Sequence, residues 1–312
     1  MKNILICALS LILFTSCSDV MEPDLGKSAV TVLAPVNNAI NQNYVQTFWW
    51  DFLNGASSYQ LQIVSPKFDS VLVLVLDTII QSNKFSISLF PGNYQWRVKA
   101  INGSSETQYV NRSLSVVASS LSGQTIVVNS PENLLESNSI LQNFTWQTLF
   151  GATRYRFQID TLQFNDEVDL VYNNTLAGVI LNYTFLNDGI YQWRVRAEND
   201  TANSLWSVIK TLSIDRVAPS NVELLSPINN STNTSPLTLS WNALTEANSY
   251  KLYVYKTDST SLFNSNFPLK INNTTSIFAL GTSGQKLYWQ VSAVDRAGNE
   301  GEKSTKRSFI VQ

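Results

Sequence analysis

The segment Tyr94-Gln95-Trp96-Arg97-Val98-Lys99-Ala100 decides the fold, because it alternates and because it recurs. Its apolar residues Trp96, Val98 and Ala100 take turns with polar ones, a period of two that predicts a β-strand with one buried face. The segment returns as Tyr191-Gln192-Trp193-Arg194-Val195-Arg196-Ala197 and, with changes, as Leu287-Tyr288-Trp289-Gln290-Val291-Ser292-Ala293. The chain is therefore predicted to repeat one β unit with a period of about 96 residues.

Other landmarks keep the same period. Each unit opens with a proline, has a tryptophan 14 or 15 positions later, and has a tyrosine nine positions after that tryptophan. These residues are Pro35, Trp50 and Tyr59; Pro131, Trp146 and Tyr155; and Pro227, Trp241 and Tyr250. The matching spacings indicate three copies of one domain. We expect Trp50, Trp96 and their equivalents to pack in the cores, because they are in phase with the apolar residues of their strands.

The units resemble fibronectin type III domains of the kind found in tandem on bacterial secreted and surface proteins. The resemblance is carried by Leu225-Ser226-Pro227-Ile228-Asn229-Asn230, by the early Trp followed by Gly-Ala or a variant, and by the Tyr-x-Trp-Arg-Val-x-Ala strand. It implies an all-β fold of three tandem immunoglobulin-like sandwiches at about residues 30–118, 124–215 and 218–312. Residues 119–123 would form a flexible joint, and residues 215–219 a shorter, stiffer one.

The resemblance also implies a tyrosine corner, in which a tyrosine hydroxyl hydrogen-bonds to the backbone a few residues upstream. Tyr94 and Tyr191 would have this role. Leu287 stands at the third position, so the third unit is expected to lack the bond.

The N-terminus reads as an export signal. Lys2 supplies a positive end, and residues 4–14 form an apolar run too short to span a bilayer comfortably. Leu13-Phe14-Thr15-Ser16-Cys17 resembles a bacterial lipobox, which implies a signal peptide at residues 1–16, lipidation of Cys17 and a lipidated tether at residues 17–29. The expected location is the outer membrane, anchored by lipid and facing the periplasm or the medium. The alternative is an ordinary signal peptide with an incidental cysteine.

The composition excludes several kinds of catalytic and metal-binding site. The 312 residues are 44% hydrophobic and 14% charged, carry a formal net charge of −2 and include no histidine. Serine–histidine and cysteine–histidine catalysis and histidine-ligated zinc are thereby excluded. Near neutrality gives no reason to expect nucleic acid as a partner, and no nucleotide-binding loop occurs. We predict no catalytic residue, no cofactor and no enzyme activity, with a glycan hydrolase that uses carboxylates alone as the competing class.

Two groups of acidic residues need an interpretation. Asp166, Glu167 and Asp169 are expected on a solvated loop or edge strand, with a weak calcium site as the alternative. Asp295, Asn299 and Glu300 surround a glycine in a segment that is typical of a hairpin turn.

Candidate binding residues are those predicted to point outward. In the third unit, Tyr253, Tyr255 and Tyr288 fall on the outer face of one sheet, where the other units have Gln, Arg and Lys. Exposed tyrosines can stack on sugar rings or anchor a protein partner; the alternative is strand aromatics chosen for β propensity. Trp49, out of phase with Trp50, is a second candidate.

Five triplets resemble the Asp-Ser/Thr-apolar acceptor of O-glycosylation in Bacteroidota. Their acceptor residues are Ser70, Thr78, Thr161, Thr201 and Ser259. Together these features predict a non-catalytic envelope lipoprotein that acts as a spacer and binding module for a glycan or an envelope protein. The first alternative is a structural or assembly component of an outer-membrane complex. The second is an accessory subunit of a carboxylate-dependent glycan hydrolase system.

Overall fold

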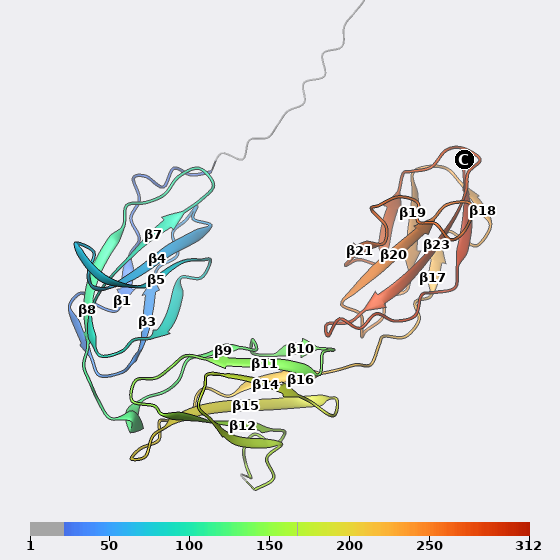
Figure 1. The fold of residues 1–312 in the computed structure, drawn as a ribbon. Helices are drawn as coiled ribbons and strands as arrows, with labels where there is room; N and C mark the ends of the chain where they lie inside the picture. The colour runs from blue at the N-terminus through green and yellow to red at the C-terminus, as the bar shows by residue number, and fades with distance from the viewer. Residues whose placement is uncertain (1–21, 167) are drawn as a thin grey trace, which may run out of the picture. The chain divides into compact units, whose positions relative to one another are not determined.

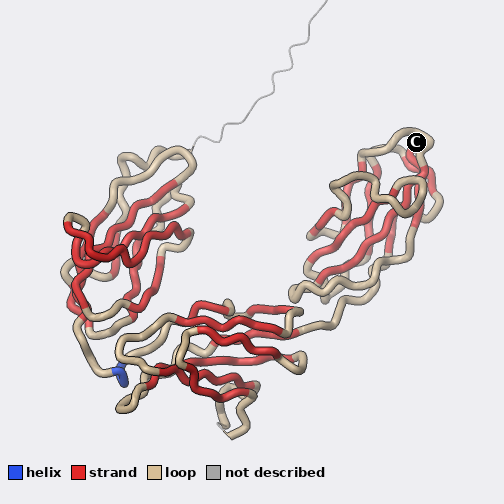
Figure 2. The backbone as a smooth tube through the Cα atoms, viewed as in Figure 1, coloured by secondary structure: helices blue, strands red, loops and turns tan. Residues whose placement is uncertain are grey.

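The computed structural model describes residues 22–166 and 168–312. The described chain contains strands β1 to β24 and one short 3-10 turn, Leu121–Gly123, but no α-helix (Figures 1 and 2). No helix among these residues is long and apolar enough to cross a membrane. Each sequence repeat forms two sheets, which confirms the predicted all-β architecture of three immunoglobulin-like sandwiches. We call them the first (β1–β8), second (β9–β16) and third (β17–β24) modules.

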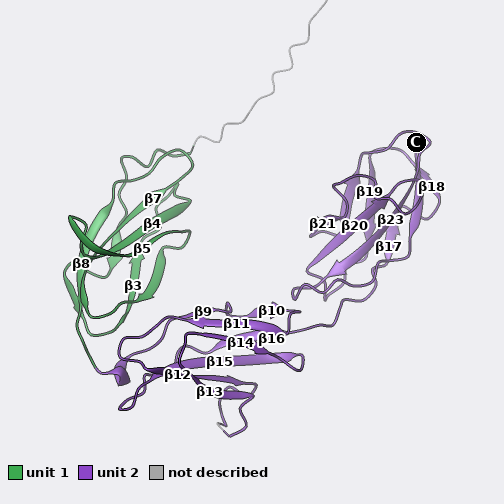
Figure 3. Cartoon of the chain, viewed as in Figure 1, with its two compact units in different colours: residues 1–119 green, residues 120–312 purple. Residues whose placement is uncertain are grey.

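The chain divides into two compact units, residues 1–119 and 120–312 (Figure 3). The first module lies in the first unit, and the other two modules lie in the second. The division falls at the start of the predicted flexible joint, residues 119–123.

In every module a three-stranded sheet faces a five-stranded one, and strand order is the same. The first module orders them β1-β3-β6 and β2-β8-β7-β4-β5, the second β14-β11-β9 and β10-β16-β15-β12-β13, and the third β17-β19-β22 and β18-β24-β23-β20-β21. The first-module strands are β1 (Val32–Ala34), β2 (Ala39–Asn41), β3 (Val45–Trp50), β4 (Ser58–Lys67), β5 (Ser70–Ile80), β6 (Lys84–Ser88), β7 (Gly92–Ile101) and β8 (Val110–Val116).

The other two modules repeat these strands with different lengths. The second has β9 (Val128–Ser130), β10 (Leu135–Ser137), β11 (Leu141–Trp146), β12 (Arg154–Asp160), β13 (Tyr172–Leu176), β14 (Ile180–Thr184), β15 (Gly189–Glu198) and β16 (Lys210–Ile214). The third has β17 (Leu224–Ser226), β18 (Ser231–Asn233), β19 (Leu237–Trp241), β20 (Ser249–Tyr255), β21 (Leu269–Ile271), β22 (Thr275–Phe278), β23 (Lys286–Val294) and β24 (Arg307–Val311).

One pairing in each module is parallel. The short strand near the start of the module lies beside its last strand: β2 beside β8, β10 beside β16, and β18 beside β24. Because the early and the last strand run in the same direction, the chain enters a module at one end and leaves it at the other.

The repeated tryptophans form the centres of the cores, as predicted. Trp50 and Trp96 are fully buried in the first module, and their equivalents in the other modules are buried as well. Their indole N–H groups have no hydrogen-bond partner among the described residues, so they contribute by packing. Aromatic edges and faces meet around them; Phe48, for example, lies 4.8 Å from Trp96 in an edge-on contact.

The tyrosine nine positions after each early Trp holds the loop between the two strands, which explains the constant spacing. Its hydroxyl oxygen accepts a backbone N–H from the loop between the two strands: Leu53 N–H to Tyr59 at 2.8 Å, Leu149 N–H to Tyr155 at 3.1 Å, and Leu244 N–H to Tyr250 at 2.9 Å. The ring also packs beside the Trp, 5.4 Å away in the first module. One side chain thus fills the core and holds the loop.

The two tyrosine corners are confirmed. The Tyr94 hydroxyl donates to the Phe90 carbonyl at 2.7 Å, and the Tyr191 hydroxyl donates to the Asn187 carbonyl at 2.9 Å. Leu287, at the same position, is buried among apolar residues of the third core.

The predicted tether, residues 17–29, is packed against the first module over part of its length. Leu25 is buried, and its N–H donates to the Ser105 hydroxyl at 2.9 Å. The Asn102 amide donates to the carbonyls of Pro23 and Gly55, at 2.8 and 3.1 Å. A buried leucine and these bonds fix the chain to the first module from Pro23 onward. Cys17 and the predicted signal peptide, residues 1–16, lie outside the described residues.

Candidate functional site

The predicted tyrosine surface lies on the expected face of the third module but is not exposed. Leu252 and Val254 of β20 point into the core, so Tyr253 and Tyr255 point to the other face, as the alternation predicts. The two rings are stacked, with centroids 6.3 Å apart and planes 9° apart. Only 8% of Tyr253 and 7% of Tyr255 is exposed, and Tyr288 of β23 is partly exposed. The expectation that all three rings face solvent is therefore wrong.

The segment between the last two strands covers these rings. We call residues 104–109, 203–209 and 301–306 the covering segments of the three modules. In the third module, the Lys303 ammonium lies 4.0 Å from the centre of the Tyr253 ring, and that of Lys306 lies 4.6 Å from the centre of the Tyr255 ring. These distances are typical of cation–π contacts, so the faces that could stack on a sugar are occupied by the protein's own lysines.

Glu300 joins the covering segment to the sheet. Its carboxylate accepts hydrogen bonds from the Lys251 ammonium and from the Tyr253 and Ser292 hydroxyls, each at 2.6 Å. Burial opposes ionisation, but the bonds from Lys251, Ser292 and Tyr253 outweigh it and lower the pKa of Glu300 to about 2. Burial, and then the bond to Glu300, raises the pKa of Tyr253 to about 12.

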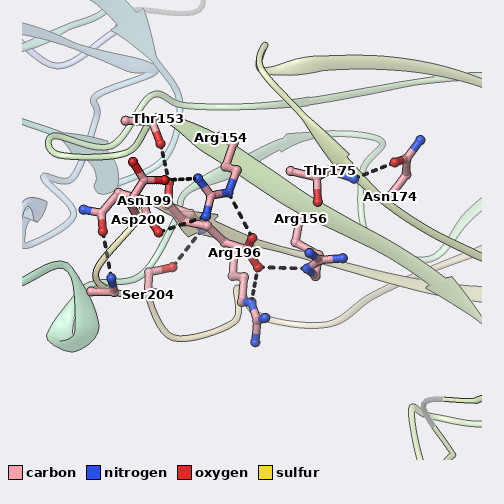
Figure 4. Close-up of polar contacts among 12 residues, drawn as sticks. Thr153, Arg154, Arg156, Asn174, Thr175, Arg196, Asn199, Asp200 and Ser204 are labelled. Atoms are coloured by element: carbon pink, nitrogen blue, oxygen red, sulfur yellow. Dashed lines mark hydrogen bonds and ion pairs between the residues drawn. The ribbon is translucent and has the colours of Figure 1, made fainter.

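The second module has a related arrangement built on Glu198. Figure 4 shows the arginines of this arrangement, and the guanidinium groups of Arg156 and Arg196 both bond to Oε1 of Glu198, at 2.8 and 2.9 Å. Arg154 lies 3.6 Å from Oε2 and also pairs with Asp200 at 2.8 Å. Burial of Glu198 opposes ionisation, but the hydrogen bonds from Arg156 and Arg196 hold its pKa below the usual range.

Arginines on the outer face of the first two modules are stacked on rings. The Arg194 guanidinium lies 4.1 Å from the centre of the Phe164 ring and 4.2 Å from that of Trp206 in the covering segment. In the first module, Arg97 has the same relation to Phe68 and to Tyr109, at 4.2 and 4.1 Å. The outer face of the five-stranded sheet is thus covered by cation–ring contacts in all three modules.

The covering segments touch the neighbouring strand once every three residues rather than every two. The N–H groups of Ser204 and Ser207 donate to the carbonyls of Ala197 and Val195, both at 2.8 Å. The Ser204 and Ser207 hydroxyls accept the N–H groups of the same two residues, at 2.9 and 3.1 Å. Thr107 and Ser304 make the same bonds in the other modules.

Sequence reasoning missed these hydroxyls because a period of three is neither a strand nor a helix pattern. The hydroxyls also occupy two different places. Thr107 and Ser204 bond residues seven positions earlier, whereas Ser207 and Ser304 bond residues twelve and thirteen positions earlier, so no single spacing marked them.

Trp49 is exposed as predicted, with 44% of its surface accessible. It lies on β3, on the outer face of the three-stranded sheet, and the Lys84 ammonium of β6 is 5.7 Å from its ring centre. The Thr47 and Ser86 hydroxyls, 2.9 Å apart, lie on the same pair of strands. Of the four predicted aromatics, Trp49 is the most exposed.

The acidic groups have structural partners. Asp295 accepts the N–H groups of Gly298 and Asn299 at 2.7 and 2.8 Å, which confirms the hairpin turn. Asp166 accepts the N–H of Val168 in its own loop, and Glu167 lies outside the described residues. The described part of the chain contains no group of three or more residues that could hold a metal ion.

The glycosylation candidates differ in access. Ser70, Thr161 and Thr201 are exposed, whereas Thr78 and Ser259 are partly buried. Asp160, which precedes Thr161, is almost fully buried and accepts the N–H of Phe164. A glycosylating enzyme that binds this carboxylate would therefore have to open the loop between Asp160 and Phe164.

Comparisons with known proteins add no conclusion about this chain. No family model and no curated protein sequence matches the chain. Among solved structures, the FN1–FN3 domains of chicken CNTN1 match at 14% identity and a TM-score of 0.43, over 90% of this chain and 97% of that one. The fibronectin(III)-like modules of Clostridium thermocellum CbhA match at 14% identity and a TM-score of 0.38, over 60% and 92%. The fold stated above rests on the strand order of this chain.

Proposed function

We propose that this chain is a non-catalytic, lipid-anchored spacer of a bacterial outer membrane that carries a binding surface away from the bilayer. The observation that carries the proposal is the parallel pairing of an early strand with the last strand in every module. Entry and exit at opposite ends let each module add its own length to the chain. A ten-residue strand such as β15 is about 33 Å long, which sets the scale of that addition.

The packed segment around Leu25 supports a short connection to the membrane. If Cys17 carries lipid, only residues 18–22 separate it from the docked Pro23, and five residues reach at most about 18 Å. The end of the first module that holds residues 51–57 and 102–106 would then be close to the bilayer.

The ligand surface is proposed to be a protein-binding one that includes Trp49. Binding of glycans by Tyr253 and Tyr255 is disfavoured, because Lys303 and Lys306 occupy the ring faces. Trp49 supplies an exposed ring, and tryptophan is one of the residues that contribute most of the binding energy where proteins meet. The assembly role remains the alternative, favoured by the exposed apolar residues of β5, Val71 to Leu74.

Labelling cells with a fatty-acid probe tests the anchor. We expect Cys17→Ala to lose the label and to leave the outer-membrane fraction, while Cys7→Ala, the matched control in the signal peptide, keeps the label. A Cys17→Ala variant that stays labelled would overturn the anchoring.

The spacing role is tested by removing residues 124–215 and measuring the distance between a fluorophore at residue 312 and the bilayer. We expect the mean distance to fall by up to about 33 Å, the length of one module. An unchanged distance would show that the modules do not act as spacers.

A further inference from the structure

The dipeptide Asn-Gly occurs twice in the chain, and both copies lie at the same end of the first module. Asn54-Gly55 is in the loop between β3 and β4, and Asn102-Gly103 directly follows β7. The two loops touch, because the Asn102 amide donates to the Gly55 carbonyl at 3.1 Å. Asparagine is a chemically labile residue, and a following glycine has no Cβ to hinder attack by its own backbone nitrogen. The module therefore holds the same reactive pair in two different environments.

Asn54 is in the open environment. It is exposed, and its side chain has no hydrogen-bond partner among the described residues. The turn around it is held from outside the dipeptide, by the Ala56 N–H on the Leu53 carbonyl at 3.1 Å and by the Leu53 N–H on the Tyr59 hydroxyl at 2.8 Å. The Gly55 N–H also has no partner in the described part of the chain. The backbone nitrogen and the side-chain amide that it would attack are thus both free to move.

Asn102 is in the closed environment, with only 7% of its surface exposed. Its Nδ2 donates to the Pro23 and Gly55 carbonyls, at 2.8 and 3.1 Å. Its Oδ1 accepts the N–H groups of Ser104 and Ser105, at 3.1 and 2.7 Å. The side chain has to leave these bonds before the next backbone nitrogen can reach it, so reaction requires local opening of the loop.

We propose that Asn54 is a site of spontaneous deamidation, and that the reaction releases the N-terminal segment, residues 22–30, from the first module. A base in the solvent removes the proton of the Gly55 N–H, and the nitrogen forms a bond to Cγ of Asn54. The bond between Cγ and Nδ2 breaks, and the nitrogen leaves as ammonia. Water then opens the cyclic imide at either of its two carbonyls. The products are aspartate and isoaspartate, so one water is consumed and one ammonia is released.

The backbone of Gly55 carries the consequence to the N-terminal segment. A Cβ at Gly55 would lie 2.9 Å from the Pro23 ring, so that ring rests directly on the glycine backbone. In isoaspartate the main chain passes through the former side chain and gains one methylene just before Gly55. The longer chain displaces Gly55 from Pro23 and its carbonyl from Asn102. The contacts that hold Pro23, and with it the buried Leu25, are thereby weakened.

Peptide mapping by mass spectrometry tests the chemical step. Residues 22–312, which include every described residue, are incubated at mildly alkaline pH. We expect the acid products of Asn54 to form about tenfold faster than those of Asn102, or more, because Asn102 reacts only after local opening. The rate at Asn54 should rise with pH, since a base removes the proton of the attacking nitrogen. An Asn54 that stays intact, or an Asn102 that reacts equally fast, would overturn the proposal.

Hydrogen exchange in the same samples tests the release. The Leu25 N–H, which donates to the Ser105 hydroxyl at 2.9 Å, should exchange several-fold faster in incubated protein than in fresh protein. Asn54→Gln is the matched control, because its longer side chain does not form the five-membered imide, and its exchange should stay slow after the same incubation. Unchanged exchange at Leu25 in deamidated protein would overturn the release, as would equally fast exchange in the incubated Asn54→Gln variant. Neither measurement depends on lipidation.

Discussion

The second and third modules both cover the outer face of their five-stranded sheet with cation–ring contacts. They differ in whether the sheet or the covering segment supplies the cation. In the second module the sheet supplies the cations, Arg194 and Arg196, and the covering segment supplies the ring of Trp206. In the third module the sheet supplies the rings, Tyr253 and Tyr255, and the covering segment supplies Lys303 and Lys306.

Both modules therefore pair a cation with an aromatic ring on this face. They differ in which segment supplies the cation and which supplies the ring. An outward aromatic in this fold is therefore no sign of a binding site until the covering segment has been examined. A carboxylate fixes the arrangement in both modules, from two different places. Glu198 is the last residue of β15, whereas Glu300 follows the turn after β23, and only Glu198 is deeply buried.

The largest difference should appear when the two carboxylates are removed. Glu198→Ala leaves Arg156 and Arg196 side by side without a counter-charge, and we expect a loss of about 2–3 kcal/mol of unfolding free energy, less than for a fully buried pair because both arginines are partly exposed. Glu300→Ala should cost no more than about 1 kcal/mol, because the third cluster is more solvated. Urea unfolding measures both, and equal losses would contradict the difference in burial.

A smaller contrast is expected for the covering segments. Trp206→Ala removes a ring that contacts two arginines and should cost about 2 kcal/mol. Lys303→Ala removes one cation from one ring and should cost about 1 kcal/mol or less. Thermal unfolding monitored by circular dichroism ranks the two variants; a reversed order would show that the lysine packs more tightly than the ring.

The pH dependence should distinguish the third module through Glu300. Its pKa is lowered from 4.5 to about 2 in the folded protein, so its contribution is complete above pH 4.5 and is lost as pH falls from about 4.5 to 2. The melting temperature of wild type should exceed that of Glu300→Gln at pH 6, and the gap should close on acidification through this window. Glu302→Gln, an exposed change in the same covering segment, serves as the control. A gap that persists at pH 2 would mean that the effect of Glu300 is not electrostatic.

The smallest effect on stability is expected for Lys306→Ala, which should nevertheless make the Tyr255 ring more accessible to solvent. The change should alter the unfolding free energy by only a few tenths of a kcal/mol, as for most surface substitutions. It uncovers one face of Tyr255, so nitration of Tyr255 should become several-fold faster while that of the partly exposed Tyr288 stays the same. Mass spectrometry reads both sites in one sample. Unchanged nitration of Tyr255 would show that other groups bury it.

The structure of the segments with strand periodicity could be predicted from the sequence. The contacts of the covering segments could not. The alternation around Trp96 and the Trp-to-Tyr spacing of nine specified the strands and the cores, because these features depend on a period of two and on fixed loop lengths. The tyrosine corners followed from the resemblance to fibronectin type III domains. The direction of Tyr253 and Tyr255 was predicted correctly for the same reason. Their burial was not, because it depends on Lys303 and Lys306, about fifty residues away in a segment with a period of three. Leu25 was missed similarly, since a single apolar residue in a polar stretch carries no periodicity.

The parallel pairing of early and last strands has a mechanical consequence. Tension between the two ends of a module pulls on strands such as β2 and β8 in opposite directions along their length, so their hydrogen bonds are loaded together in shear. Two antiparallel strands pulled from one end would open one bond at a time. Unfolding under force is governed by the rate of crossing the unfolding barrier, and shear loading raises the force needed to reach that rate. Each module therefore contains, beside its last strand, a short clamp of three residue pairs that resists stretching of the chain.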